Sequence, residues 1–239
     1  MACFVLVHGA WHGGWCWANT ERPLRTMGHE VFSPTLTGQG DRSHLLTPDI
    51  TPDSHVTDIM NFIRWRDLEN IILVGHSYGG LVTTGVAAQM PERLRALIYL
   101  DAFVPEVSGA SIFANANPAR MAKFQEQIDA GAHAVAPDHF DSWTDNPETK
   151  QWLIAKCTPQ PVGTLSHGVT LTGAEAQISH KHFIIAQRNT PSAFWPEYHK
   201  IQGRPGWTHD SIDAKHDAMV DAGDVLARKL DAYARKICA

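Results

Sequence analysis

The stretch that decides the fold is Asn70-Ile-Ile-Leu-Val-Gly-His-Ser-Tyr-Gly-Gly80. Its apolar first half predicts a buried strand, and the helix-like residues 81–90 follow it directly. Between the two lies Gly-x-Ser-x-Gly, whose serine is Ser77. A serine on so tight a turn needs neighbours without side chains, and the turn raises its hydroxyl above the end of the strand. Ser77 is therefore the candidate nucleophile, and the amide of Tyr78, where the helix begins, is a candidate oxyanion donor.

The N-terminal segment supplies the other half of a candidate site. An apolar run over residues 4–7 predicts a strand that leads into His8 and then into a glycine-rich loop. A loop in this position normally provides the second oxyanion amide, so the backbone N–H of Ala10 is the candidate. His8 is predicted to shape the loop by hydrogen bonding rather than to carry protons.

Short apolar runs alternate with longer stretches of helical period along the rest of the chain. This alternation predicts an α/β fold with a doubly wound, mainly parallel sheet. The predicted strands cover residues 3–7, 30–35, 71–75, 96–101, 183–187 and 208–212. The predicted helices cover residues 17–27, 52–68, 78–90, 196–201 and 219–236.

Residues 106–180 interrupt this alternation. They are rich in Ala, Asn, Asp, Pro and Gln, with helical pieces predicted at 120–130 and 147–155. A long insertion after the fourth strand is where a cap over an active site would lie. We therefore expect a single domain over residues 1–239, with an inserted helical cap at 106–180.

Composition and charge exclude several classes of function. The formal net charge is −5, and no basic stripe indicates a nucleic-acid partner. The longest apolar runs have the length of strands, so no membrane span is expected. Met1 leads directly into the first strand, and no signal peptide is visible. The four cysteines are scattered, which favours reduced thiols and a cytoplasmic location.

Several of these segments together carry a family resemblance. They are residues 4–17, 38–41, 75–80, 99–105 and 216–219. The chain resembles the methylesterase and hydroxynitrile lyase branch of the α/β-hydrolase superfamily, which includes plant salicylate-binding-type methylesterases and bacterial pyrethroid hydrolase-like esterases. The resemblance implies an α/β-hydrolase fold with about six mainly parallel strands and an inserted cap. It also implies no metal, no organic cofactor and often a homodimer.

The resemblance assigns the general base to His216, which follows the last predicted strand and precedes the C-terminal helix. The family's acid follows the penultimate strand, but the matching position here is Asn189, which carries no charge. Two solutions stay open. Asp101, at the end of the fourth strand, supplies the carboxylate, or Asn189 orients the ring as a neutral partner, as asparagine does in papain-like enzymes. We favour Asp101.

Other activities are known on the same scaffold. Hydroxynitrile lyases of this branch rely on a threonine after the first-strand histidine and a lysine after the catalytic histidine. This chain has Gly9 and Asp217 at these positions, so hydroxynitrile lyase activity is not expected. Ser77 excludes dehalogenases and epoxide hydrolases, which need an aspartate nucleophile. A cofactor-free lyase, a C–C hydrolase, a dioxygenase and a catalytically weak ligand-binding relative stay open. The histidines at 180 and 182 lack metal-ligand spacing.

These residues predict a serine carboxylesterase that hydrolyses a small hydrophobic or aromatic ester through an acyl-enzyme. The expected partner is thus a small-molecule ester. Aromatic residues fall in the segments expected near the pocket, namely Trp11, Trp15, Phe103, Phe113, Phe140, Trp143 and Trp152. Among them Trp11, Phe103 and Trp143 are the candidate substrate-binding residues.

Overall fold

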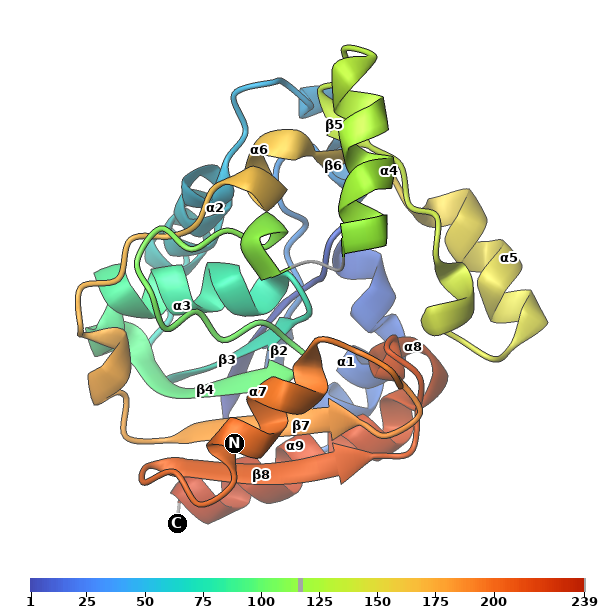
Figure 1. The fold of residues 1–239 in the computed structure, drawn as a ribbon. Helices are drawn as coiled ribbons and strands as arrows, with labels where there is room; N and C mark the ends of the chain where they lie inside the picture. Colours follow the sequence, from blue (N-terminus) through green and yellow to red (C-terminus); the bar gives the residue numbers. More distant parts are fainter. Residues whose placement is uncertain (116–117, 239) are drawn as a thin grey trace.

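A six-stranded parallel sheet forms the middle layer of the computed structural model (Figure 1). The strand order is β2-β1-β3-β4-β7-β8. The strands are β1 (Cys3–Val7), β2 (Glu30–Phe32), β3 (Ile71–His76), β4 (Leu94–Leu100), β7 (Lys181–Ala186) and β8 (Trp207–Ile212). The predicted fold class is confirmed. The structure describes residues 1–115 and 118–238, so positions 116, 117 and 239 of the predicted cap and domain lie outside the described residues.

Helices cover both faces of this sheet. Buried apolar side chains of α1 (Ala18–Thr26) and α9 (Gly223–Cys238) pack on one face. Those of α2 (Pro52–Arg64) and α3 (Gly79–Gln89) pack on the other. The central strands are therefore apolar on both faces, as expected of a parallel sheet between helix layers.

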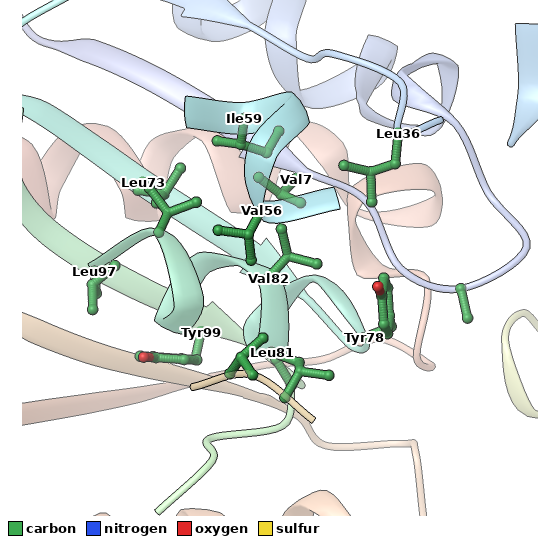
Figure 2. Packing of buried hydrophobic residues seen from close by; sticks show 14 of the residues in the cluster. Val7, Leu36, Val56, Ile59, Leu73, Tyr78, Leu81, Val82, Leu97 and Tyr99 are labelled. Carbon is green, nitrogen blue, oxygen red and sulfur yellow. The ribbon is translucent and has the colours of Figure 1, made fainter. Parts of the chain in front are cut away.

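The core between the sheet and α2–α3 holds the nucleophile turn in place. Figure 2 shows Val56 and Ile59 of α2 packed with Val7 and Leu73 of the sheet, and Tyr78 lies at the edge of this cluster. The start of α3 comes very close to β1, because a Cβ at Gly79 would lie 2.6 Å from the carbonyl oxygen of Val7. No other residue fits this close approach without a shift of the backbone.

The segment between β4 and β7 contains α4 (Pro118–Asp129), α5 (Pro147–Lys156) and α6 (Val162–Ser166). It also contains a short antiparallel pair, β5 (Ala134–Val135) with β6 (Gln160–Pro161). In Figure 1, α4 and α5 stand outside the helix layers that cover the sheet. The helical pieces predicted here agree with α4 and α5, but the β5–β6 pair was missed, because strands of two residues have no readable period.

The predicted helix over residues 219–236 is wrong as a single helix. The chain forms α8 (Ala218–Asp221) and then α9, with a break at Ala222. Gly223 lies against α1 there, and a Cβ on it would be 2.5 Å from the backbone of Asn19. The remaining helix is α7 (Phe194–Ile201), as predicted within two residues. Within residues 1–115 and 118–238, we find no helix of sufficient length and apolar character to cross a membrane.

Candidate active site

Ser77 lies on a strained turn between β3 and α3. Its φ is +52°, in the left-handed region that residues with side chains rarely adopt. Hydrogen bonds hold the turn: the amide of Ser77 donates to Leu100 (3.2 Å), and its carbonyl accepts from the amide of Phe103 (3.1 Å). A Cβ at Gly75 would lie 2.6 Å from the carbonyl oxygen of Gly79, and one at Gly79 would lie 2.6 Å from that of Val7, which explains both glycines of the motif. The structure thus forms the strand–turn–helix that the sequence predicts.

His216 follows β8 and lines the same cavity as Ser77. Its Nδ1 lies 2.6 Å from Oδ2 of Asp101, and its ring stacks on Phe194 with centroids 5.2 Å apart. Because a carboxylate oxygen is an acceptor, Nδ1 carries the proton in this hydrogen bond. Nε2 of the neutral ring then has a lone pair that can accept a proton, as a general base requires.

Asp101 lies behind His216 at the end of β4 and is fully buried. Three donors converge on its carboxylate. Oδ2 accepts from Nδ1 of His216 and from Nδ2 of Asn189, each at 2.6 Å, and Oδ1 accepts from the amide of Ala186 at 3.2 Å. Nδ2 of Asn189 is also 3.3 Å from Nδ1 of His216, but both atoms donate to Asp101. The two residues between which the sequence left a choice therefore meet: Asp101 contacts the ring, and Asn189 binds Asp101.

The two residues that carry the candidate oxyanion amides also belong to the site. Ala10 and Tyr78 both line the cavity, and within residues 1–115 and 118–238 neither amide has a hydrogen-bond partner. The loop that carries Ala10 is shaped by His8, whose Nδ1 donates to the carbonyl of Gly9 (2.8 Å). Nε2 of His8 accepts from the amide of Leu36 (3.0 Å). His8 thus makes the structural hydrogen bonds that the sequence predicts.

The cavity has a volume of about 740 Å³. The three candidate substrate-binding residues, Trp11, Phe103 and Trp143, all line it, and so does Phe113. The other three aromatic residues named above, Trp15, Phe140 and Trp152, are not part of the lining. Trp15 and Trp152 pack against each other, and Phe140 packs edge-on against Trp143, each pair with ring centroids 4.9 Å apart.

Sequence reasoning missed several residues of the cavity wall. Phe124 of α4 and Phe194 of α7 add aromatic surface. Lys123, Asp138 and His139 make one part of the wall polar, with Asp138 2.9 Å from His139 and 3.2 Å from Lys123. Burial acts to raise the pKa of Asp138, but the hydrogen bonds from its two partners lower it below its ordinary value. No local motif marks these residues, because the fold of the insertion brings Phe124, Lys123, Asp138 and His139 to the cavity, and the position of α7 after β7 brings Phe194 there.

One group of side chains could be considered for a metal. In the part of the chain that the structure describes, ligand atoms of His76, His216 and Asp217 lie within 4.8 Å of one another. Nδ1 of His216 is already bonded to Asp101, and Nε2 of His76 donates to the carbonyl of His216 (3.0 Å). These two nitrogens are therefore taken up by the internal network, whereas Nδ1 of His76 and Oδ1 of Asp217 have no hydrogen-bond partner among the described residues.

Buried histidines near and below the site predict sensitivity to acid. Burial lowers the pKa of His8 to about 3, of His55 and His182 to about 4, and of His76 well below the ordinary value. In the unfolded chain these rings take up protons near pH 6.5. The folded state therefore binds fewer protons than the unfolded state between about pH 6.5 and 4, and stability falls as the pH drops through this window.

We expect the Tm to be highest at pH 7–8 and to fall steeply below about pH 6.5, as measured by circular dichroism. The variant His182→Phe removes one proton-accepting ring away from the cavity, and its Tm should decline less steeply with acid. The raised pKa of His12 changes the pH dependence of stability in the opposite direction, but this is one histidine, whereas four histidines have a lowered pKa. A Tm that stays constant from pH 8 to pH 5 would contradict this account.

Comparison with known proteins places this geometry in a family. Residues 4–235 match the model of the alpha/beta hydrolase family. The chain belongs to the α/β-hydrolase family. A carbendazim hydrolyzing esterase from Nocardioides sp. (strain SG-4G) is 40% identical to this α/β-hydrolase over 241 residues, which cover 97% of this chain and 99% of the relative. Methylesterase 2 of Arabidopsis thaliana is 32% identical over 46% of this chain and 43% of its own length.

Solved structures agree on the fold. An extracellular α/β-hydrolase from a Paenibacillus species, described as sharing structural and functional homology with tobacco salicylic acid binding protein 2, has a TM-score of 0.86 at 22% identity. The superposition covers 98% of this chain and 99% of that one. A methylesterase from Arabidopsis has a TM-score of 0.75 at 20% identity, over 97% of this chain and 98% of that one. The sequence relatives support an esterase function, and the structures support the α/β-hydrolase fold.

Proposed function

We propose that this α/β-hydrolase is a serine carboxylesterase that hydrolyses a small hydrophobic or aromatic ester through an acyl-enzyme. One observation carries the proposal. Ser77, on its strained turn, and His216, hydrogen-bonded to the buried Asp101, line one cavity rich in aromatic residues, together with Ala10 and Tyr78, whose amides are the candidate oxyanion donors. A nucleophile, a base, an acid and two oxyanion donors are the groups that acyl transfer needs.

The proposed reaction has two halves. Nε2 of His216 takes the hydroxyl proton of Ser77 while Oγ attacks the carbonyl carbon of the ester. The carbonyl oxygen becomes an oxyanion, to which the amides of Ala10 and Tyr78 donate. The C–O bond to the alcohol then breaks, and the proton passes from His216 to the departing oxygen. Water repeats the sequence on the acyl-enzyme and releases the acid, while Asp101 stabilises the imidazolium in each half.

Three finer statements are proposals of the same kind. The segment 106–180 is a cap within one domain, and this is supported by the fact that it supplies Phe113, Phe124 and Trp143 to the cavity wall. A cytoplasmic location is supported by four cysteines that are all free. The homodimer stays a prediction from the family resemblance, and sedimentation velocity tests it.

The proposal is tested with p-nitrophenyl acetate and butyrate, aromatic methyl esters, and carbendazim, after which the relative is named. We expect turnover with an initial burst of nitrophenol, because the acyl-enzyme forms before water releases it. Absence of Ser77-dependent turnover on the whole panel would reject the esterase. The alternatives would then be a C–C hydrolase, a cofactor-free lyase or dioxygenase, or a ligand-binding relative.

Phe103 is predicted to set the fit of the acyl group. Its amide donates to the carbonyl of Ser77, and its ring packs on Phe194 at the cavity wall. Phe103→Ala should raise KM for the butyrate ester by about tenfold and leave kcat within about threefold, because it removes apolar contact made equally in ground and transition states. Steady-state kinetics measure the split. A fall of kcat at constant KM would show that Phe103 instead positions the nucleophile turn.

A further inference from the structure

A buried ion pair lies beside the proposed catalytic groups but is not one of them. Nε2 of His12 is 3.0 Å from Oδ2 of Asp217, and the two side chains are only 2% and 0% exposed. His12 is in the glycine-rich loop after β1, and Asp217 directly follows His216. An ion pair held out of water generally adds little net stability, so its presence calls for another role.

Both ring nitrogens of His12 face acceptors. Nδ1 lies 2.7 Å from the carbonyl oxygen of Ala10, and Nε2 lies against the Asp217 carboxylate. A neutral imidazole has one N–H and can satisfy only one of these contacts. The His12–Asp217 pair must therefore hold one proton more than a neutral ring with an ionised carboxylate. Burial acts to lower the pKa of His12, but the charge and hydrogen bond of Asp217 outweigh it and raise the pKa.

A second, partly buried histidine–aspartate pair shows the contrast. Nε2 of His29 is 2.9 Å from Asp231, but Nδ1 of His29 accepts from the amide of Ala2 (3.2 Å). One acceptor and one donor suit a neutral ring, so this pair needs no extra proton. It also lies away from the cavity lining. His29–Asp231 is thus a matched control for His12–Asp217.

The carbonyl that His12 contacts belongs to a strained peptide. The next residue, Trp11, has φ +66°, and its amide donates to the buried Oε1 of Gln160 (2.9 Å). The peptide between Ala10 and Trp11 is therefore held at its oxygen by His12 and at its nitrogen by Gln160. A side-chain-bearing residue keeps such a backbone conformation only when its surroundings impose it. The preceding peptide is held by His8 through the carbonyl of Gly9.

These contacts converge on one functional atom, the amide nitrogen of Ala10. The hydrogen bond from His8 fixes the peptide that contains this amide, and the hydrogen bond from His12 fixes the peptide after it. Because each peptide is planar and trans, the hydrogen bond to the carbonyl of Gly9 fixes the direction of the Ala10 N–H. The hydrogen bond to the carbonyl of Ala10 fixes the peptide on the other side of the Ala10 Cα, so the backbone at Ala10 is held from both sides. Asp217 ties this arrangement to the base, because it directly follows His216 in the chain. The amide of Asp217 donates to the carbonyl of Trp143 (3.0 Å), which holds this part of the backbone in place.

We propose that His12, held by Asp217, is a positioning residue of the oxyanion hole: by donating from Nδ1 to the carbonyl of Ala10, it holds the peptide that follows Ala10 and, together with His8, keeps the Ala10 amide aimed at the developing oxyanion. The inference rests on the proposed esterase function. It assigns no proton transfer to His12, whose two N–H groups are both used. A donor that is aimed in advance stabilises the transition state more than the bound substrate, so its loss lowers kcat rather than raising KM.

The test compares three double variants, each without an unpaired buried charge. His12→Phe/Asp217→Leu removes the contact to Ala10 and should lower kcat about 10- to 100-fold at nearly constant KM, with weaker inhibition by a trifluoromethyl ketone that forms a tetrahedral adduct. His12→Asn/Asp217→Leu places the Asn Nδ2 where Nδ1 was, and it should restore kcat to within about fivefold. The matched control His29→Phe/Asp231→Leu should lower Tm and leave kcat unchanged.

The outcomes separate this inference from the esterase proposal. If the wild type shows no Ser77-dependent turnover, the esterase proposal fails. If the wild type turns over and the Phe/Leu variant keeps its kcat, or the Asn/Leu variant rescues nothing, the positioning role is wrong. Should the Phe/Leu variant not fold, side-chain ¹⁵N NMR of the wild type at pH 8 decides. The signals of His12 are assigned by their change in the Asp217→Asn variant. A protonated Nδ1 on His12 in the wild type supports the inference, and an unprotonated Nδ1 overturns it.

Discussion

Ser77→Ala is expected to lower kcat/KM for p-nitrophenyl butyrate by about 10⁵-fold or more and to abolish the burst. The reason is that alanine removes the oxygen that forms the acyl-enzyme, so only binding and the oxyanion donors remain to assist direct attack by water. Folding should be preserved, because the strained φ of +52° at this position costs alanine no more than serine. Stopped-flow absorbance measures both the burst and the steady state.

An exposed serine of the insertion offers the control. Ser166→Ala changes the same functional group outside the cavity lining and should retain the wild-type rate. Labelling with a fluorophosphonate and mass spectrometry of the digest should place the adduct on Ser77 alone. An adduct on another serine, or a Ser77→Ala variant with more than a tenth of the wild-type activity, would remove Ser77 as the nucleophile.

Asp101→Asn is expected to lower kcat by about 10³- to 10⁴-fold, with a smaller change in KM. The carboxylate accepts from three donors on its two oxygens, whereas an amide offers one acceptor oxygen and one NH₂ group. The NH₂ group of the introduced asparagine must therefore point at one of these donors, where it cannot form a hydrogen bond. If the NH₂ group faces His216, the ring is turned to the tautomer whose Nε2 carries the proton and cannot accept that of Ser77. Near-UV circular dichroism checks that the variant folds.

The companion variant is Asn189→Ala, which decides between the two solutions that the sequence left open. It removes one of the three donors to Asp101 but leaves the 2.6 Å contact to His216, so the loss in kcat should stay within about tenfold. A reversed ranking, with Asn189→Ala crippled and Asp101→Asn mild, would make Asn189 the partner that orients the ring and Asp101 a structural residue.

The sequence by itself determined the groups that lie on single strand–turn units. Ser77 and Tyr78 follow from an apolar strand, a glycine-flanked turn and a helix, and Ala10 follows from the glycine-rich loop after the first strand. The alternation of short apolar runs with stretches of helical period also indicated the parallel sheet. These features are readable because strain, close backbone approach and burial impose residue types at fixed local spacing. His216 was identified through family resemblance and its place after the last strand.

Only the tertiary structure decided which distant residues meet. Asp101 and His216 are 115 residues apart, and they touch because β4 and β8 both flank β7 and their carboxyl ends meet at one edge of the sheet. His12 and Asp217 are 205 residues apart and have no motif of their own. The aromatic residues of the insertion divided between cavity wall and packing for the same reason. Contacts across such distances depend on the order of the strands and the path of the insertion, which no local spacing in the chain records.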